Sequence, residues 1–296
     1  MAKLQSQAIL FELLRSFTSL AKTLNLSKTV RELGSTRQTV RRHINLLEEH
    51  KGEPLFRLED RQYQLTEAGK RALPEALRLL SRGQAWLNNQ SDHINGLTHL
   101  TFDENTPLPY YLQQHPLGRL WKDSSELMQY GFQCWARAKG EIENEVFENI
   151  RPYLMIYRRY EKEWICIEIG DQSSYASWYG WGRARSSIGR DITDLPRGAG
   201  FANLLAQTFE EVAANEGVRL DHIHTQHMNP EKDMLVPISY QRLLMGCRFP
   251  DGSFALAALI DRTHDIEIAG LSKKQIRSMP KELVMNIDTK LLKTLP

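Results

Sequence analysis

One short stretch, STRQTVRRHINLLEEHKGEPLF at residues 35–56, combines hydroxyl, amide and guanidinium side chains with a regular series of apolar residues. Lysine and arginine bind phosphate groups, and arginine, glutamine and hydroxyl side chains also form hydrogen bonds with base edges. These residue types therefore favour recognition of a polyanion such as a nucleic acid. The candidates in the stretch are Thr36, Arg37, Gln38, Thr39, Arg41 and Arg42.

A helix must hold these side chains in place. Gly34 can end a preceding helix, and Ser35 followed by Gln38 has the form of a capping box. We therefore expect a helix to start near Thr36. Its apolar residues then recur at helical spacing and predict one buried stripe, formed by Val40, Ile44 and Leu47.

A second short helix is predicted over residues 27–34, with Ser27 as its N-cap and with Val30 and Leu33 facing inward. Two short helices joined at a turn that contains glycine form a helix-turn-helix. Taken alone, the basic helix could equally be the solvated face of a small helical domain.

A hairpin is predicted directly after the basic helix. Gly52 ends the helix, and β-forming residues then flank the polar segment 59–62, which would be the tip, or wing. The hairpin residues are Leu55, Phe56, Tyr63 and Leu65.

Residues 9–85 as a whole resemble the winged helix-turn-helix of LysR-type transcriptional regulators. That family's pattern has paired small residues, a leucine, a hydroxyl-led recognition helix, Leu-Glu, a glycine, Leu-Phe, a basic wing and Leu-Thr-x-Ala-Gly. The same order at the same intervals reads here Thr29-Val30, Leu33, Thr36, Val40, Ile44, Leu47-Glu48, Gly52, Leu55-Phe56, Arg61, Leu65-Thr66 and Ala68-Gly69.

The resemblance implies that the six candidates of the basic helix enter the major groove of double-stranded DNA. It also implies that Lys28 and Arg61 contact phosphate or the flanking minor groove. The sequence departs from the family where DNA contacts are expected, which predicts an unusual target sequence. The departures are Thr29-Val30 for Ala-Ala, Arg37-Gln38 for Gln-Pro, Arg41 for a serine and Leu58 for an arginine.

Residues 66–97 are expected to form the linker helix by which such regulators dimerise. Its apolar residues have a 3–4 spacing that suits a seam between helices, or the packing of an amphipathic helix on its own domain. Pro74 should kink this helix or mark the first turn of a second one. The spaced residues are Leu73, Leu77, Leu80, Leu87 and Ile94.

The remaining chain lacks the βα alternation of the family's usual effector domain. Residues 98–149 predict a proline-containing linker with one short strand, followed by mainly helical sequence. Residues 150–268 predict two strands, short helices, a longer helix over 200–217 and three antiparallel strands, an order that resembles the PAS sensor fold. Residues 269–296 are expected to be a tail. The predicted fold class is α+β.

A PAS-like domain can hold a small-molecule effector, be empty or serve as a dimer face. The candidates for lining a pocket are Trp178, Tyr179, Trp181, Phe209, His224 and Cys247, although most aromatic residues of a small domain fill its core. His222 and His224 would share one face of a strand and His227 the other. We expect strand histidines here and no metal site.

Composition sets the remaining bounds. Residues 1–97 carry a net charge of +5 within a total of +2, which hints at a polyanionic partner for this part. The three cysteines are far apart and favour a reducing, cytoplasmic compartment. No signal peptide and no membrane span are predicted.

Catalytic and phosphate-cradling motifs are absent from the sequence, so we expect no enzyme and no cofactor. The sequence predicts a sequence-specific transcriptional regulator that binds double-stranded DNA as a homodimer or a higher homo-oligomer. The alternative is a ligand- or redox-sensing module that acts through protein contacts and has a degenerate helix-turn-helix.

Overall fold

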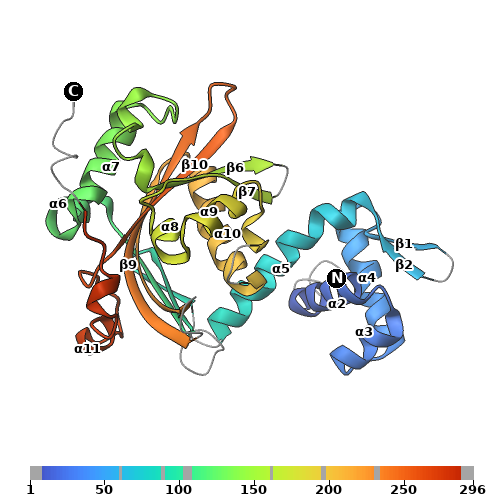
Figure 1. Cartoon of the computed structure of the whole chain (residues 1–296). Helices are drawn as coiled ribbons and strands as arrows, with labels where there is room; N and C mark the ends of the chain where they lie inside the picture. The colour runs from blue at the N-terminus through green and yellow to red at the C-terminus, as the bar shows by residue number, and fades with distance from the viewer. Residues whose placement is uncertain are drawn as a thin grey trace. The chain divides into compact units, whose positions relative to one another are not determined.

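The computed structural model describes residues 9–59, 62–87, 91–102, 109–160, 163–194, 198–229 and 234–287. The chain divides into two compact units, residues 1–90 and residues 91–296. Figure 1 shows helices in the first unit and a large curved sheet with helices in the second.

The first unit is a winged helix-turn-helix followed by a long helix. Its elements are α2 (Leu10–Thr23), α3 (Leu26–Leu33), α4 (Arg37–Lys51), β1 (Phe56–Glu59), β2 (Gln62–Leu65) and α5 (Glu67–Leu87). The predicted stripe of Val40, Ile44 and Leu47 is buried against Phe17 and Leu20 of α2. The predicted hairpin is confirmed, because β1 and β2 pair antiparallel from Phe56–Leu65 to Glu59–Gln62.

Both predicted N-caps of the helix-turn-helix are wrong by one or two residues. The cap of α4 is Thr36 and not Ser35, because the Thr36 hydroxyl accepts a hydrogen bond from the Thr39 amide at 3.1 Å. The cap of α3 is Asn25 and not Ser27. Asn25 Oδ1 accepts from the amides of Ser27 and Lys28 at 3.0 and 3.1 Å, which extends the helix to include the buried Leu26.

The predicted linker helix is shorter than expected. α5 ends at Leu87, and it continues through Pro74. Ile94, expected on this helix, lies instead in a strand, β3 (Ser91–Ile94). Asn95 and Gly96, both with positive φ, make a tight turn into the next strand, and this turn is incompatible with a continuing helix.

The second unit is built on an eight-stranded sheet in the order β3-β4-β5-β8-β9-β10-β6-β7, and its neighbouring strands pair antiparallel. The strands after β3 are β4 (Leu97–Phe102), β5 (Tyr110–His115), β6 (Leu154–Tyr160), β7 (Glu163–Ile169), β8 (Val218–Asn229), β9 (Met234–Arg248) and β10 (Phe254–Arg262). The helices are α6 (Leu120–Asp123), α7 (Glu126–Arg137), α8 (Ser174–Tyr179), α9 (Trp181–Ser187), α10 (Gly198–Asn215) and α11 (Lys273–Ile276).

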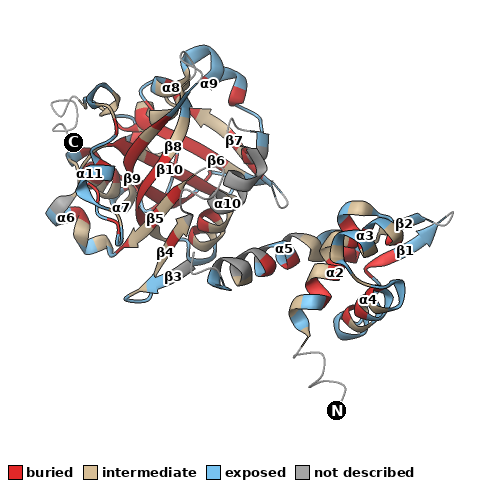
Figure 2. Cartoon of the chain, turned by 90° about the horizontal axis from the view of Figure 1, so that it is seen from below, coloured by how far each residue is buried: buried red, intermediate tan, exposed pale blue. Residues whose placement is uncertain are grey.

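Both faces of this sheet are covered, so its central strands are buried (Figure 2). On one face Leu243 and Met245 of β9 pack with Leu127 of α7. On the other face Leu244 of β9 packs with Phe209 of α10. Alternation of side chains along β9 separates these two clusters, and we refer to them as the α7 face and the α10 face.

The order of elements from β6 to β10 is the one expected from the sequence: a hairpin, short helices, a longer helix and three antiparallel strands. Two other expectations for this unit are wrong. Residues 98–149, expected to begin with a linker that has one short strand, contribute a further strand, β5, which lies between β4 and β8. The supposed tail packs on the domain, with Ile276 and Met279 buried.

Candidate nucleic-acid interface

The turn between α3 and α4 sets the start of the basic helix. Gly34 has φ of 58°, a left-handed conformation that glycine adopts at little cost, and it ends α3. Two residues later the Thr36 hydroxyl caps α4 and also lies 2.9 Å from the Thr39 hydroxyl. Both hydroxyl groups are thereby held at the first turn of α4.

The inner side of α4 is anchored in the core. Val40 is fully buried, and Ile44 and Leu47 are nearly so. His43, missed in the sequence, is buried beside them, and its Nδ1 lies 2.8 Å from the Ser16 hydroxyl of α2. Burial, and next the charge of Arg42, lower the pKa of His43, so this inner side carries no charge at neutral pH.

The outer side of α4 is exposed and basic. Arg37, Gln38, Arg41 and Arg42 are all exposed, whereas Thr39 is half-buried. No acidic residue occurs between Arg37 and Leu47. Arg37 Nη2 donates to the Ser27 hydroxyl at 2.8 Å and so bridges the two helices. Within the described residues, Arg41 and Arg42 form no ion pair, so their guanidinium groups can engage an external anion.

The two other predicted DNA contacts stand differently. Lys28 is exposed on the first turn of α3, near the cap formed by Asn25. Arg61 lies outside the described residues. In the wing, Leu58 is 63% exposed, and Arg57 is paired with Glu59 at 3.1 Å. The described part of the wing therefore presents an apolar side chain beside a neutralised arginine.

The wing is attached through residues to which the sequence alone assigned no role. Glu48 Oε1, from the Leu-Glu pair of α4, accepts hydrogen bonds from the amides of Leu55 and Phe56 at 2.7 and 3.0 Å. Gly69 lies so close to the chain that an added Cβ would be 2.1 Å from the Leu55 carbonyl oxygen. The Leu-Glu and Ala-Gly signatures thus hold the hairpin against α4 and α5.

The six predicted pocket residues of the second unit are not brought together. Cys247 is buried on the α7 face, and Phe209 packs on the α10 face, so the sheet separates them. Trp181 is 49% exposed. Trp178 and Tyr179 lie together on α8, and both rings contact His227 of β8, at centroid distances of 5.6 and 6.4 Å.

His224 and His222 share the α7 face of β8, as the alternation predicted. His224 Nδ1 lies 2.8 Å from the Ser239 hydroxyl, and burial lowers the pKa of His224 to about 4. The ring of His222 packs against that of His115 with centroids 4.0 Å apart and an interplanar angle of 47°. In the part of the chain that the structure describes, no group of three or more His, Cys, Asp or Glu residues could hold a metal ion.

The first unit thus presents a winged helix-turn-helix whose exposed second helix is basic. Residues 11–70 match the family model described as "Bacterial regulatory helix-turn-helix protein, lysR family". The chain is 43% identical over 70 residues to the HTH-type transcriptional regulator CitR of Bacillus subtilis (strain 168), which covers 24% of each protein. It is 39% identical over 83 residues to the HTH-type transcriptional activator AllS of Salmonella paratyphi A, and this match covers 28% of this chain and 26% of that protein.

The chain therefore spans about a quarter of the length of these curated relatives. Among solved structures, the crystal structure of a CbnR_DBD-DNA complex is similar with a TM-score of 0.26 and 25% identity, covering 27% of this chain and 91% of that one. Among the described residues, no helix is both long and apolar enough to cross a membrane.

Proposed function

We propose that the protein is a sequence-specific, DNA-binding transcriptional regulator. The observation that carries this proposal is the outer side of α4, where Arg41 and Arg42 are exposed without an ion pair among the described residues while the inner side is locked in the core. A rigid helix with unpaired guanidinium groups suits the major groove, where arginine reads guanine and glutamine reads adenine. The similarity of residues 11–70 to the LysR helix-turn-helix supports the same conclusion.

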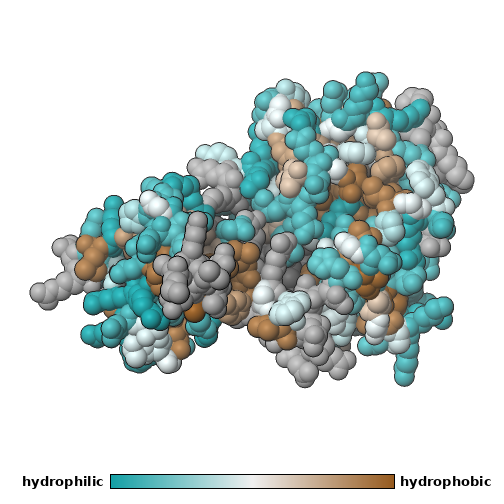
Figure 3. Space-filling model, turned by 180° about the vertical axis from the view of Figure 1, so that it is seen from behind, coloured by the Kyte–Doolittle hydropathy of each residue, from teal (hydrophilic) through white to brown (hydrophobic). Residues whose placement is uncertain are grey.

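Within this function the candidate residues form two groups, according to whether they would contact bases or phosphates. Gln38, Arg41 and Arg42 read base edges, with Arg37, Thr36 and Thr39 at the start of the helix. Lys28 and Arg61 contact phosphates. The exposed Leu58 would replace a phosphate contact by an apolar one at the wing, which fits an altered target sequence. In Figure 3 hydrophilic side chains cover part of the visible face of this unit, beside smaller hydrophobic patches, and they are compatible with such contacts.

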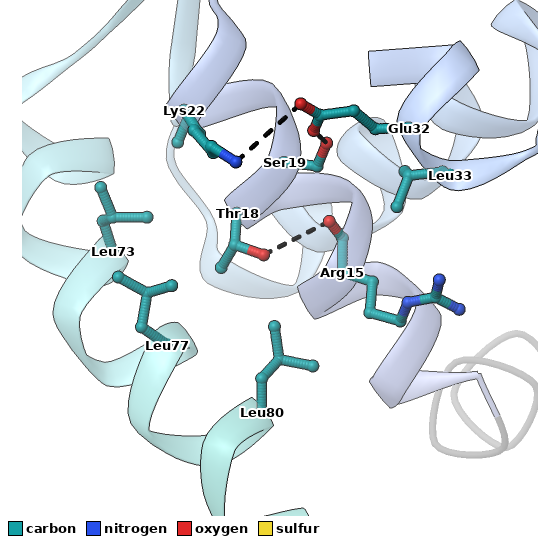
Figure 4. A pocket seen from close by; sticks show the side chains of 10 residues that line it. Arg15, Thr18, Ser19, Lys22, Glu32, Leu33, Leu73, Leu77 and Leu80 are labelled. Carbon is teal, nitrogen blue, oxygen red and sulfur yellow. Dashed lines mark hydrogen bonds and ion pairs between the residues drawn. The ribbon is translucent and has the colours of Figure 1, made fainter. Parts of the chain in front are cut away.

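A homodimer is the form in which we expect the protein to bind DNA. α5 exposes Leu77, Leu79, Trp86 and Leu87, each 44–69% exposed, and a second copy of the chain would cover them. An open groove lies between α2 and α5, with Leu73, Leu77 and Leu80 pointing into it from α5 (Figure 4). Two-fold pairing would place two α4 helices on successive half-sites.

The second unit would act as a PAS-like sensor that modulates DNA binding. The support is the order of elements from β6 to β10 and the antiparallel pairing of their strands, which leave no room for parallel βα units. A small-molecule effector fits this role.

A redox sensor is the less favoured candidate. Burial raises the pKa of Cys134 to about 11 and that of Cys166 and Cys247 to about 12. Thiols that stay protonated at neutral pH react slowly. The exposed arginines of α4 also weigh against a degenerate helix-turn-helix, because a disused DNA surface has no reason to remain basic.

The test is selection of genomic DNA fragments by the purified full-length chain at two salt concentrations. Recovery of a two-fold symmetric motif, with affinity that falls steeply as salt rises, is the expected result. Weak retention without a shared motif would overturn the proposal and favour the protein-interaction alternative.

A further inference from the structure

Three exposed arginines lie close together in sequence on the surface of the second unit. Arg183 and Arg185 belong to α9, and Arg190 follows that helix. We call these three residues the arginine patch, and Figure 2 shows α9 at the surface of this unit. Residues 172–190 contain the patch and no acidic residue, whereas residues 98–296 together have a net charge of −3. The patch is therefore basic within an otherwise acidic part of the chain.

The arginines of the patch share one region of the surface. The Arg183 guanidinium lies 5.6 Å from the centroid of the Tyr179 ring. Burial raises the pKa of Tyr175, whereas the charges of Arg183 and Arg190 lower it, so both guanidinium groups lie near this phenol. Arg185 is one helical turn from Trp181, which is 49% exposed. Cations and an exposed aromatic ring thus occur side by side.

The backbone beneath the patch is fixed to the domain. Ala184 and Ser187 are buried on the inner side of α9, and the Ser187 hydroxyl lies 2.8 Å from the Tyr175 hydroxyl of α8. Beyond the helix, the Arg190 carbonyl accepts a hydrogen bond from the Cys166 amide of the edge strand β7 at 2.9 Å. The arginine side chains therefore start from fixed positions, which lowers the entropy cost of binding a partner.

The charges of the patch are not neutralised by the described residues. Arg248, exposed on the same unit, pairs with Glu216, but no arginine of the patch forms an ion pair in the described part of the chain. Asp191, which follows Arg190, is half-buried, and its carboxylate accepts a hydrogen bond from the Trp164 amide at 3.1 Å. The guanidinium groups can therefore engage an anion outside the chain.

A partner that fits the patch must present several anionic groups to an open surface. Arginine forms two parallel hydrogen bonds with a phosphate, and its guanidinium is more weakly hydrated than the ammonium of lysine. The exposed Ser186 hydroxyl and the Trp181 ring, next to the arginines in sequence, supply further contacts of the kind made with phosphate and sugar. A row of phosphates in a nucleic-acid backbone has this chemistry.

We propose that the arginine patch is a second DNA-binding surface, which contacts phosphates of double-stranded DNA outside the motif that α4 reads. Once α4 is bound, the flanking duplex is present at a high local concentration, so a few phosphate contacts increase the affinity measurably. Contacts to phosphate add affinity without sequence preference. The inference rests on the proposed DNA-binding function and extends it to the second unit.

The experiment uses the full-length chain and two DNA fragments. The short fragment contains only the selected motif, and the long one adds flanking duplex on both sides. The first variant combines Arg183→Gln, Arg185→Gln and Arg190→Gln, and the second replaces the same three residues by lysine. The matched control combines Lys273→Gln, Lys274→Gln and Arg277→Gln, which removes the same charge from exposed residues elsewhere on the second unit.

On the long fragment, the glutamine variant should bind about tenfold more weakly than the wild type at low salt. Its slope of log affinity against log salt concentration should be smaller by about 3. The lysine variant should recover most of this slope, because it keeps the charge. Wild type and glutamine variant should bind the short fragment equally. Hydroxyl-radical footprinting should show protected backbone outside the motif with the wild type and not with the glutamine variant.

Equal affinity of wild type and glutamine variant for the long fragment overturns the proposal, and the patch then faces solvent or another macromolecule such as an acidic protein. An equal loss in the control variant also overturns it, because the effect is then one of net charge. No recovery in the lysine variant excludes a contact based on charge. If the glutamine variant does not fold, Arg185→Gln alone is measured; a slope smaller by about 1 supports the patch and an unchanged slope overturns it.

The short fragment separates this inference from the proposed function. Binding of the short fragment by the wild type, with no effect of the patch on the long one, removes the second surface and leaves the DNA-binding function intact. A wild type that retains neither fragment would remove the proposed function itself, and this inference with it.

Discussion

Lowering the pH from 7 to 5 is expected to destabilise the second unit through two buried histidines. Burial lowers the pKa of His222 to about 2, with the charges of His115 and Arg119 acting in the same direction. Burial also lowers the pKa of His224 to about 4. In the unfolded chain both titrate near 6.5.

Hydrogen bonding explains why His222 stays neutral in the folded state. Its Nδ1 accepts a hydrogen bond from the Glu267 amide at 2.9 Å, and an N–H can only donate. The free lone pair of His222 is therefore already used, and protonation would break this contact. In addition, Nη1 of Arg119 lies 3.3 Å from Nδ1 of His115, whose ring packs against that of His222.

The sign and size follow from linkage. Because the folded pKa values lie below 6.5, the unfolded state binds protons first as the pH falls. The stabilisation is complete above about pH 6.5 and is lost on acidification below it. At pH 5 each histidine lowers the free energy of unfolding by about 2 kcal/mol, and the two together lower it by about 4 kcal/mol. This is a large part of the ~5–15 kcal/mol by which a typical protein is stable.

Urea unfolding at pH 7 and pH 5, followed by tryptophan fluorescence, measures this loss. Five of the six tryptophans lie in the second unit, at positions 121, 135, 164, 178 and 181. His224→Gln should have a smaller loss than the wild type, by about 2 kcal/mol. An equal free energy of unfolding at both pH values, or an unaltered pH dependence in His224→Gln, would refute the reasoning.

Four further predictions concern the first unit. Arg42→Ala should weaken specific binding to a selected DNA fragment by about 1–3 kcal/mol, whereas Lys28→Ala should lower the slope of log affinity against log salt concentration by about 1. Fluorescence anisotropy at several salt concentrations separates the two effects. An affinity of Arg42→Ala equal to that of the wild type would remove Arg42 from the residues that read bases. Glu48→Ala should speed hydrogen exchange in peptides that cover residues 55–65, since it removes the acceptor of two backbone amides at a cost of about 1–3 kcal/mol. The matched control is Glu49→Ala, because Glu49 is exposed on the same helix. Identical exchange in both variants would mean that Glu48 does not hold the wing. Leu77→Glu should shift the chain from dimer to monomer, because it places a charge on the exposed apolar side of α5. Light scattering after size-exclusion chromatography measures the shift. A dimer that persists would show that the interface lies elsewhere.

The elements of the first unit were predictable because they follow local rules. Helical spacing placed Val40, Ile44 and Leu47 in the core, and β-forming residues on both sides of a polar tip predicted the hairpin. The caps were harder, since Ser35 and Thr36 are both good cap residues one position apart. The residue that caps α4 is the one whose position lets the following apolar residues reach the core. A cap motif alone does not contain that information.

In the second unit, β5 and the packed C-terminal segment were not predicted, and the reason is different. YYLQQH alternates only weakly between apolar and polar residues, because β5 is covered on both faces and places Gln113 opposite His222 of β8. Its place in the sheet depends on pairing with residues more than a hundred positions away, and local composition does not record that pairing. The same holds for Met279, whose sulfur accepts from the Ser239 amide.

The buried guanidinium of Arg242 shows the limit most clearly. In the sequence, MLVPISYQRLLMGCRFP predicts a strand with one arginine in its middle, which resembles the alternation of a half-exposed strand. A helix that covers this face converts the arginine into a buried charge, and its partner Asp221 is drawn in from β8, where Arg219 competes for the same carboxylate. Because a buried charge is costly without a partner, Arg242 depends on the carboxylate of Asp221, and the sequence around Arg242 does not indicate which strand supplies that carboxylate.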